Sequence, residues 1–375
     1  MLRAAAIVAL LAASSQAQSS VANFTPSEYA KMSARILAAL RLAPGERVLI
    51  PRDPGYFDGL IPLLEAGVRR AKAVPALTEW TRKGARREGA PIAELLNSTD
   101  VFLWLPFRTT EREVTPEENR AIARWTDQGG SRRQVHFHWD QGSVLADGLM
   151  GPHSAELDRV MIAALEVNVP AMAAAQRRAE QMLRAGKVRV ATKAGTDITF
   201  EIRDRPFNRQ DGVATGLRMR SAKVRVDREI ELPAGVLRVA PIEETANGTI
   251  VVPEARFGGK IVKGLRLTFT NGKITSMIAN EGLAAVQNEL TAAGDAALRF
   301  REFGLGFNPK LVAPPSSKIL PYFAYGAGMV RMSLGDNEEL GGAIRGGYRR
   351  WFFFPDASVE VNGKFLTDQG RLLVR

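Results

Sequence analysis

Histidine is rare in this chain, and two of its three histidines lie close together. His136 and His138 fall two residues apart in a segment, residues 134–139, that predicts a β-strand. Side chains two apart on a strand point to the same face, so both could ligate one metal ion. No carboxylate motif accompanies them, and the favoured interpretation is structural, with both imidazoles packed or hydrogen-bonded at a strand end. His153 follows Gly151-Pro152 and is expected in a turn or at a helix N-cap.

A second set of candidate ligands consists of carboxylates in the C-terminal half. Glu302 comes directly after a helical pattern and before a glycine-rich turn. Carboxylates without histidine can hold hard cations, which prefer oxygen ligands. A single carboxylate is usually solvated at the surface. The weaker candidates of this set are Glu243, Glu244, Asp336 and Glu338.

Several other chemistries are excluded by the composition. The chain has no cysteine, which rules out thiolate nucleophiles, zinc–cysteine sites and iron–sulfur clusters. It has no G-x-S-x-G sequence, so a Ser-His-Asp hydrolase is not expected. The pairs Gly341-Gly342 and Gly346-Gly347 lack the strand–loop–helix context of a phosphate loop and predict turns. The net charge of +11 favours anionic ligands, but the basic residues are scattered, which argues against nucleic-acid binding.

The first residues predict a cleavable secretory signal. A positive start at Arg3 is followed by a short apolar run, residues 4–13, and then by Ser15-Gln16-Ala17. This order of charge, apolar run and small residues is typical of a signal peptide, with cleavage expected after Ala17. We therefore expect residues 1–17 to be removed and the protein to be periplasmic or secreted. No later segment is long and apolar enough to span a membrane.

The rest of the chain predicts two regions that would position these residues. Over residues 18–186, strands alternate with helices, which predicts an α/β domain with a parallel sheet and helices on both faces. The pattern changes near residue 187, after which strand-like segments are joined by Asn-Gly turns, with one helix at about residues 282–301. Residues 187–375 therefore predict a strand-rich α+β domain.

Six short motifs of the second region resemble, in the same order, segments of the aminopeptidase T / aminopeptidase S family of dinuclear metallo-exopeptidases. The motifs lie at residues 195–200, 232–241, 247–251, 267–274, 301–309 and 333–337. Together they span about residues 190–370. The resemblance implies a thermophilic-aminopeptidase-like fold in two parts, and it implies a homodimer.

The resemblance also implies where a metal site would lie, and the chain departs from the family there. Of the implied ligands, one glutamate is clearly kept. The candidate pocket residues are Glu302, which is that glutamate; Val236, in place of a second one; Arg331, in place of a histidine; Glu338, at a tyrosine of some members; and Arg350 and Phe352, in place of a His-x-Asp pair.

Arginine changes the chemistry expected of such a pocket. A guanidinium cannot lose a proton to become a metal ligand, and it repels cations. Glu302 is therefore expected to pair with Arg331 or Arg350, leaving a pocket preorganised for anions.

Three functions remain open on the sequence alone. The first is an exported, non-catalytic aminopeptidase relative, a pseudoenzyme without cofactor, that binds a small anionic ligand or a peptide. The second is an active metallo-aminopeptidase that uses zinc, cobalt or manganese. Its ligands would be Glu302 and the replacement carboxylates Glu243, Glu244, Asp336 and Glu338. The third is a structural or interaction protein without pocket chemistry.

Overall fold

A computed structural model describes residues 24–79, 82–83, 86–87, 92–108, 115–315 and 317–374. The predicted signal segment, residues 1–17, lies outside the described residues. Within them, no helix has both the length and the apolar character needed to cross a membrane.

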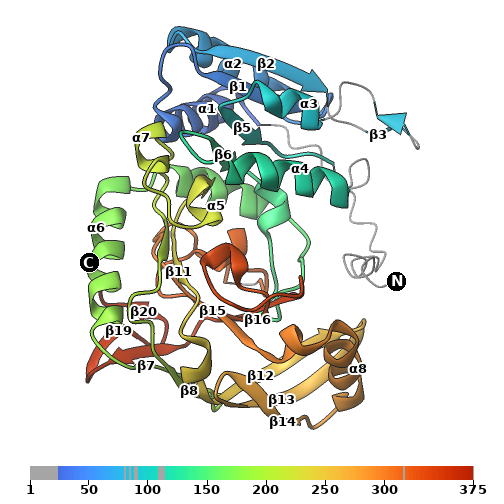
Figure 1. Cartoon of the computed structure of the whole chain (residues 1–375), viewed down its shortest axis with the longest axis vertical. Helices are drawn as coiled ribbons and strands as arrows, with labels where there is room; N and C mark the ends of the chain where they lie inside the picture. The colour runs from blue at the N-terminus through green and yellow to red at the C-terminus, as the bar shows by residue number, and fades with distance from the viewer. Residues whose placement is uncertain are drawn as a thin grey trace.

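A five-stranded parallel sheet lies at one end of the molecule (Figure 1). Every hydrogen-bonded pair of neighbours in it is parallel, as predicted for the first region. Its strands, in spatial order, are β10 (Glu229–Glu231), β6 (Arg133–His136), β5 (Val101–Trp104), β1 (Arg47–Arg52) and β2 (Val74–Glu79).

Helices cover both faces of this sheet because its buried strands are apolar on both sides. Leu49 and Phe102 pack with residues of α3 and α4, whereas Val48 and Leu103 pack with residues of α1 and α2 on the other face. The α-helices of the whole described chain, not only those on this sheet, are α1 (Pro26–Leu40), α2 (Ile61–Arg70), α3 (Ile92–Asn97), α4 (Pro116–Asp127), α5 (Ala155–Leu165), α6 (Val169–Arg184), α7 (Gly216–Met219) and α8 (Leu283–Ala293).

Local sequence signals explain where several helices begin and end. Thr25 and Glu28 form a capping box at the start of α1, and Thr115 and Glu118 form another at the start of α4. The predicted helix at residues 282–301 is shorter than expected, because Gly294, at φ 84°, ends α8.

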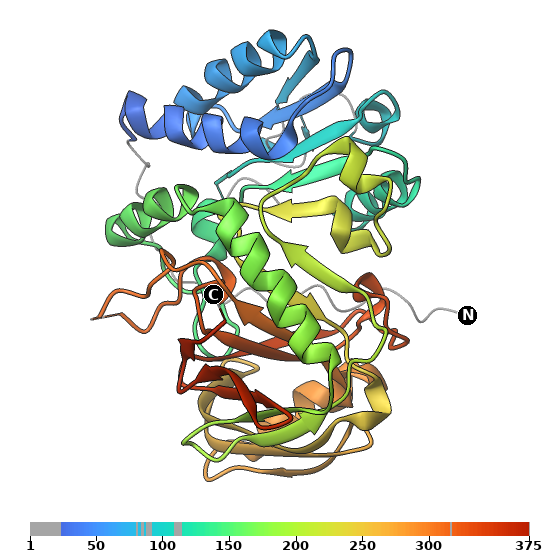
Figure 2. The ribbon, with the colours of Figure 1, turned by 90° about the vertical axis from the view of Figure 1, so that its left-hand side faces the viewer.

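The second half forms two antiparallel sheets that lie below the parallel sheet in the view of Figure 1, with β12, β13 and β14 at the opposite end of the molecule. The five-stranded one has the order β17-β16-β15-β11-β9, and α6 runs along the flank of the molecule between the parallel sheet and the lower strands (Figure 2). Its strands are β9 (Phe207–Gln210), β11 (Val236–Val239), β15 (Phe300–Gly306), β16 (Val330–Gly335) and β17 (Arg349–Phe354).

The eight-stranded sheet has the order β14-β13-β12-β8-β7-β18-β19-β20. Its strands are β7 (Val188–Ala191), β8 (Asp197–Phe200), β12 (Asn247–Phe257), β13 (Lys260–Thr270), β14 (Lys273–Ile278), β18 (Ser358–Val361), β19 (Lys364–Asp368) and β20 (Arg371–Leu372). A two-stranded ribbon is formed by β3 (Arg82–Lys83) and β4 (Arg86–Arg87).

One strand crosses the boundary expected near residue 187. Although β10 belongs to the second half of the sequence, it pairs with β6 in parallel, so that Ile230 faces Val135 and Glu231 faces His136. Ile230 is fully buried and joins the core that the parallel sheet shares with its helices. The parallel sheet therefore contains strands from both regions of the sequence.

Candidate functional site

The position implied by the resemblance is occupied by a buried carboxylate surrounded by arginines. Glu302 is 0 % exposed on β15. Its Oε1 accepts hydrogen bonds from Arg238 Nε (2.8 Å) and from Arg331 Nε and Nη2 (2.9 and 2.6 Å). Its Oε2 accepts from Arg301 Nη1, from Arg238 Nη2 (3.4 Å) and from Trp351 Nε1 (3.4 Å).

Strand pairing brings these side chains together. Arg238 on β11 and Arg331 on β16 both lie opposite Gly304 of β15, two residues from Glu302. Gly304 leaves room for Arg331, since a Cβ there would lie 2.7 Å from Arg331 Cγ. The register of β15 shifts between Phe300 and Glu302, and Arg301 also reaches the Glu302 carboxylate.

A second carboxylate completes the group. Glu339 accepts from Arg238 Nη2 (3.2 Å), Arg301 Nη2 (2.5 Å) and Arg349 Nη1 (2.6 Å). We call Arg238, Arg301, Arg331, Arg349, Glu302 and Glu339 the arginine cluster. Four guanidinium groups and two carboxylates give 4 − 2, or a net charge of +2.

Electrostatics hold the Glu302 carboxylate in its charged form. Burial alone would raise its pKa, but the charges of Arg238, Arg331 and Arg301 lower the pKa well below the usual value. A carboxylate offers about four lone-pair sites. Six N–H donors already use both oxygens, which leaves Glu302 no free lone pair for a metal ion.

Of the other predicted pocket residues, Arg331 joins Glu302, but Arg350 does not. Glu302 pairs with Arg331, one of the two arginines expected to reach it, whereas Arg350 Nη1 lies 3.4 Å from Glu289 Oε1 and its guanidinium lies 4.1 Å from the centre of the Phe257 ring. The reason is the alternation of side chains along β17. Trp351 pairs with Ser333 and points toward Glu302, so its neighbours Arg350 and Phe352 point away.

The remaining candidates do not form a ligand set. Val236 and Phe352 are buried apolar residues, and Glu338 is an exposed partner of Arg345, with 3.1 Å between Oε1 and Nε. Asp336 accepts hydrogen bonds from the backbone N–H groups of Gly346 and Gly347. Glu243 is bonded to Arg205 and Asn337, and Glu244 is exposed. In the described part of the chain, these carboxylates do not converge on one point.

The histidines form a cluster that the sequence did not reveal in full. His136 Nδ1 lies 3.2 Å from His138 Nε2 and 3.5 Å from Oε1 of Glu231, a residue of β10. Burial would lower the pKa of His136, but the adjacent Glu231 raises it above the usual value. Burial would raise the pKa of Glu231, but hydrogen bonding to His136 lowers it to about 2. Only the His-x-His spacing signalled this cluster, because Glu231 arrives through a distant strand.

His153 lies in a separate polar chain of Ser143, His153 and Asp158. Its Nδ1 is 2.8 Å from Ser143 Oγ, and its Nε2 is 2.8 Å from Asp158 Oδ1. These are the residue types of a hydrolase triad, which the sequence did not lead us to expect. Ser143 is only 2 % exposed, however, so a substrate could not reach its hydroxyl. The arrangement therefore serves the packing of this loop.

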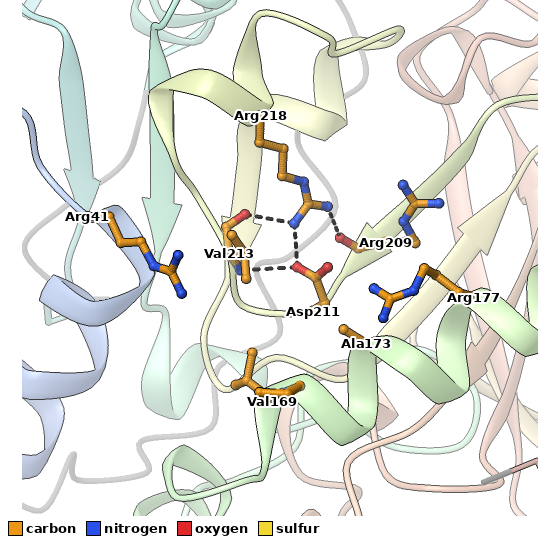
Figure 3. A pocket seen from close by; sticks show the side chains of 9 residues that line it. Arg41, Val169, Ala173, Arg177, Arg209, Asp211, Val213 and Arg218 are labelled. Carbon is orange, nitrogen blue, oxygen red and sulfur yellow. Dashed lines mark hydrogen bonds and ion pairs between the residues drawn. The ribbon is translucent and has the colours of Figure 1, made fainter.

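A surface pocket of about 390 Å³ lies between α1, α6, β9 and α7, and arginine dominates its lining (Figure 3). Arg218 is held by Asp211 and by the carbonyl oxygens of Val213 and Arg209, both at 2.8 Å. We call this the four-arginine pocket. Its lining residues are Arg41, Arg177, Arg209, Arg218, Asp211, Val169, Pro170, Ala173 and Val213.

Solved structures with this fold are known. A 2,5-dihydroxypyridine dioxygenase from Pseudomonas putida matches with a TM-score of 0.64 at 15% identity, over 94% of this chain and 99% of its own. AmpT from Thermus thermophilus, an aminopeptidase T, matches with a TM-score of 0.59 at 16% identity, over 93% of this chain and 100% of its own. The chain has an aminopeptidase-like fold. No protein-family profile matches the sequence, and neither does any curated protein.

Proposed function

We propose that this chain is a non-catalytic relative of the aminopeptidases that binds small anionic ligands and holds no metal ion at Glu302. The observation that supports the absence of a metal ion, and with it the absence of catalysis, is the hydrogen bonding of Glu302. Its two carboxylate oxygens accept six N–H groups. Arginine at 238, 301 and 331 replaces the cation charge with fixed guanidinium charge. An ion would have to displace these groups and would meet their repulsion.

The four-arginine pocket supports anion binding. Its four guanidinium groups, together with the carboxylates of Asp211 and of Glu180, the partner of Arg209, give 4 − 2, or a net charge of +2. Arg218 and Arg209 are already held in place, the latter by Glu180 at 2.6 Å. Among the described residues, neither Arg41 nor Arg177 has a carboxylate partner, and both are exposed. They are therefore the guanidinium groups that remain for a ligand.

The lining also suggests the kind of anion. Val169, Pro170 and Ala173 add an apolar wall beside the arginines. A small carboxylate or phosphate compound with a short apolar part would satisfy both surfaces. We further propose that the protein is exported after cleavage of its signal and that it forms a homodimer, both as the sequence predicts.

Titration calorimetry with succinate and with phosphate tests the ligand. Arg41→Glu with Arg177→Glu should weaken binding at least about tenfold, because two charge-assisted contacts are lost. The matched control is Arg178→Glu with Arg220→Glu, which changes the net charge equally at exposed positions outside the pocket. Equal binding by both double variants, or none by the parent chain, would refute the proposal.

Release of N-terminal residues from peptides tests the absence of catalysis at Glu302. With added zinc, cobalt or manganese, we expect no release of N-terminal residues that depends on Glu302. Metal-dependent release that Glu302→Gln abolishes in a folded protein would make the chain an active aminopeptidase instead.

A further inference from the structure

We propose that His136, His138 and Glu231 bind one divalent first-row transition-metal ion, zinc or iron(II). Its residues are none of those of the arginine cluster or of the four-arginine pocket, and the proposal is independent of the function proposed above. Its ligand atoms are two imidazole nitrogens and one carboxylate oxygen. These three atoms all lie within 4.8 Å of one another.

Sheet pairing sets the geometry. Glu231 and His136 are directly paired on the neighbouring parallel strands β10 and β6, and His138 follows two residues after the end of β6. The nitrogens of His136 and His138 are 3.2 Å apart, and His136 Nδ1 is 3.5 Å from Glu231 Oε1. An ion about 2.1 Å from each ligand, at tetrahedral or octahedral angles, places ligand atoms about 3.0–3.4 Å apart. The two separations that involve His136 already lie in or close to this range, and the third, between His138 and Glu231, lies within 4.8 Å, so rotation of these side chains would close the set around an ion.

Buried hydrogen bonds fix which nitrogen of His136 faces the ion. Thr126 Oγ donates to the carbonyl of Ile122 (2.8 Å) and accepts from Gln134 Nε2 (2.6 Å). Gln134 Oε1 is thereby left to accept from His136 Nε2, at 3.1 Å. The proton of neutral His136 then resides on Nε2, and Nδ1 presents its lone pair to the site. Outer-shell partners of this kind orient histidine ligands in metal sites.

The carboxylate is oriented as well. The hydroxyl group of Tyr322 lies 2.9 Å from Glu231 Oε2 and 3.0 Å from the carbonyl oxygen of His136. It holds Oε2, so that Oε1 is directed toward the histidines. Tyr322 belongs to a 3-10 turn in which Tyr322, Phe323 and Ala324 all have positive φ, at 40°, 49° and 57°. Three successive left-handed residues without glycine strain the backbone, and such strain concentrates at functional sites.

The donor set selects the metal class. Two imidazoles with one carboxylate suit zinc and iron(II), whereas calcium and magnesium prefer oxygen ligands alone. Three protein ligands leave coordination positions open for water or a small ligand. The rings of Trp104 and Phe323 lie 5.9 and 6.1 Å from that of His138 and form aromatic walls beside those positions.

Metal content of the full chain after incubation with Zn²⁺ and removal of free ions tests the site. We expect about one ion per chain, and its loss in the double variant His136→Asn with His138→Asn. The matched control, His153→Asn, removes the third histidine, which lies outside the site, and should keep the ion. A parent chain without bound zinc, or a double variant that retains it, would overturn the proposal.

Two further measurements test the site even if the double variant fails to fold. Tyr322→Phe keeps all three ligands but frees the carboxylate, so zinc affinity should fall about 10- to 100-fold. The Co²⁺-loaded parent chain should show visible absorption bands that change in this variant and not in His153→Asn. Unchanged affinity and spectrum in Tyr322→Phe would count against the site. Anion binding in the four-arginine pocket should be the same in all these variants, so failure of either proposal can be recognised separately.

Discussion

Arg331 donates two hydrogen bonds, at 2.6 and 2.9 Å, to the same oxygen of Glu302, across the pairing of β15 with β16. The resemblance to aminopeptidases would place a metal-binding histidine at residue 331. A cationic side chain and a carboxylate meet instead, and two more arginines close the remaining directions around Glu302. The negative charge of Glu302 is thus balanced by arginine side chains of the same chain.

Glu302→Gln should destabilise the protein by about 3–5 kcal/mol, because it leaves buried guanidinium groups without their counter-charge. Urea unfolding would measure the loss. The matched control is Glu338→Gln, an exposed carboxylate with a single arginine partner, for which we expect a change within about 0.5 kcal/mol. Equal effects of the two substitutions would show that Glu302 does not hold the cluster.

Gly304→Ala should destabilise by about 1–3 kcal/mol, because its Cβ would lie 2.7 Å from Arg331 Cγ and displace the guanidinium. In an Arg331→Ala background the same change should cost much less. Double-mutant unfolding measurements test this coupling. Additive effects would contradict the close approach.

Stability should decrease as the pH falls below about 4.5, the ordinary value for glutamate. The folded-state pKa of Glu302 lies well below that value, and that of Glu231 is lowered to about 2. The stabilisation from each carboxylate is therefore present above about pH 4.5 and is lost as the pH falls toward the folded-state pKa. Urea midpoints between pH 7 and pH 3 measure this, and Glu302→Gln should show a smaller decrease. If the urea midpoint fell equally with pH in the parent chain and in Glu302→Gln, Glu302 would not be a source of the pH dependence.

The protein recovered outside the cytoplasm should begin at Gln18, after cleavage behind Ala17. Mass spectrometry of the intact secreted chain measures its N-terminus. Replacing Ala17 by a bulky residue should shift or prevent cleavage. Recovery of chains that still begin at Met1, in equal amounts, would refute export by this signal.

The alternation of strands and helices over residues 18–186 predicted the parallel sheet and its helices. The structure shows the local reasons: Val101–Trp104, the central strand β5, is an apolar run, and the capping box at Thr25 starts α1. The contact between Glu302 and Arg331 could be predicted because the resemblance implies that both residues lie at one metal site of the family. Strand alternation would also have warned that Arg350 and Trp351 cannot both face Glu302.

The missed residues share one cause, which is pairing between distant segments. Arg238 is 64 residues from Glu302 and reaches it through the β11–β15 ladder. Glu231 meets His136 only because β10 returns to the parallel sheet. Neither register follows from propensity or periodicity, since each depends on which strands become neighbours in the whole fold.

The return of β10 to the edge of β6 has a consequence for dissecting the molecule. A fragment that stops at residue 186 would expose the N–H and C=O groups of β6 that now bond to β10, and it would lack the buried Ile230. Such an open edge invites pairing with another chain. Separately expressed halves should therefore aggregate or need each other to fold. The two regions of the intact protein should melt together in one cooperative step.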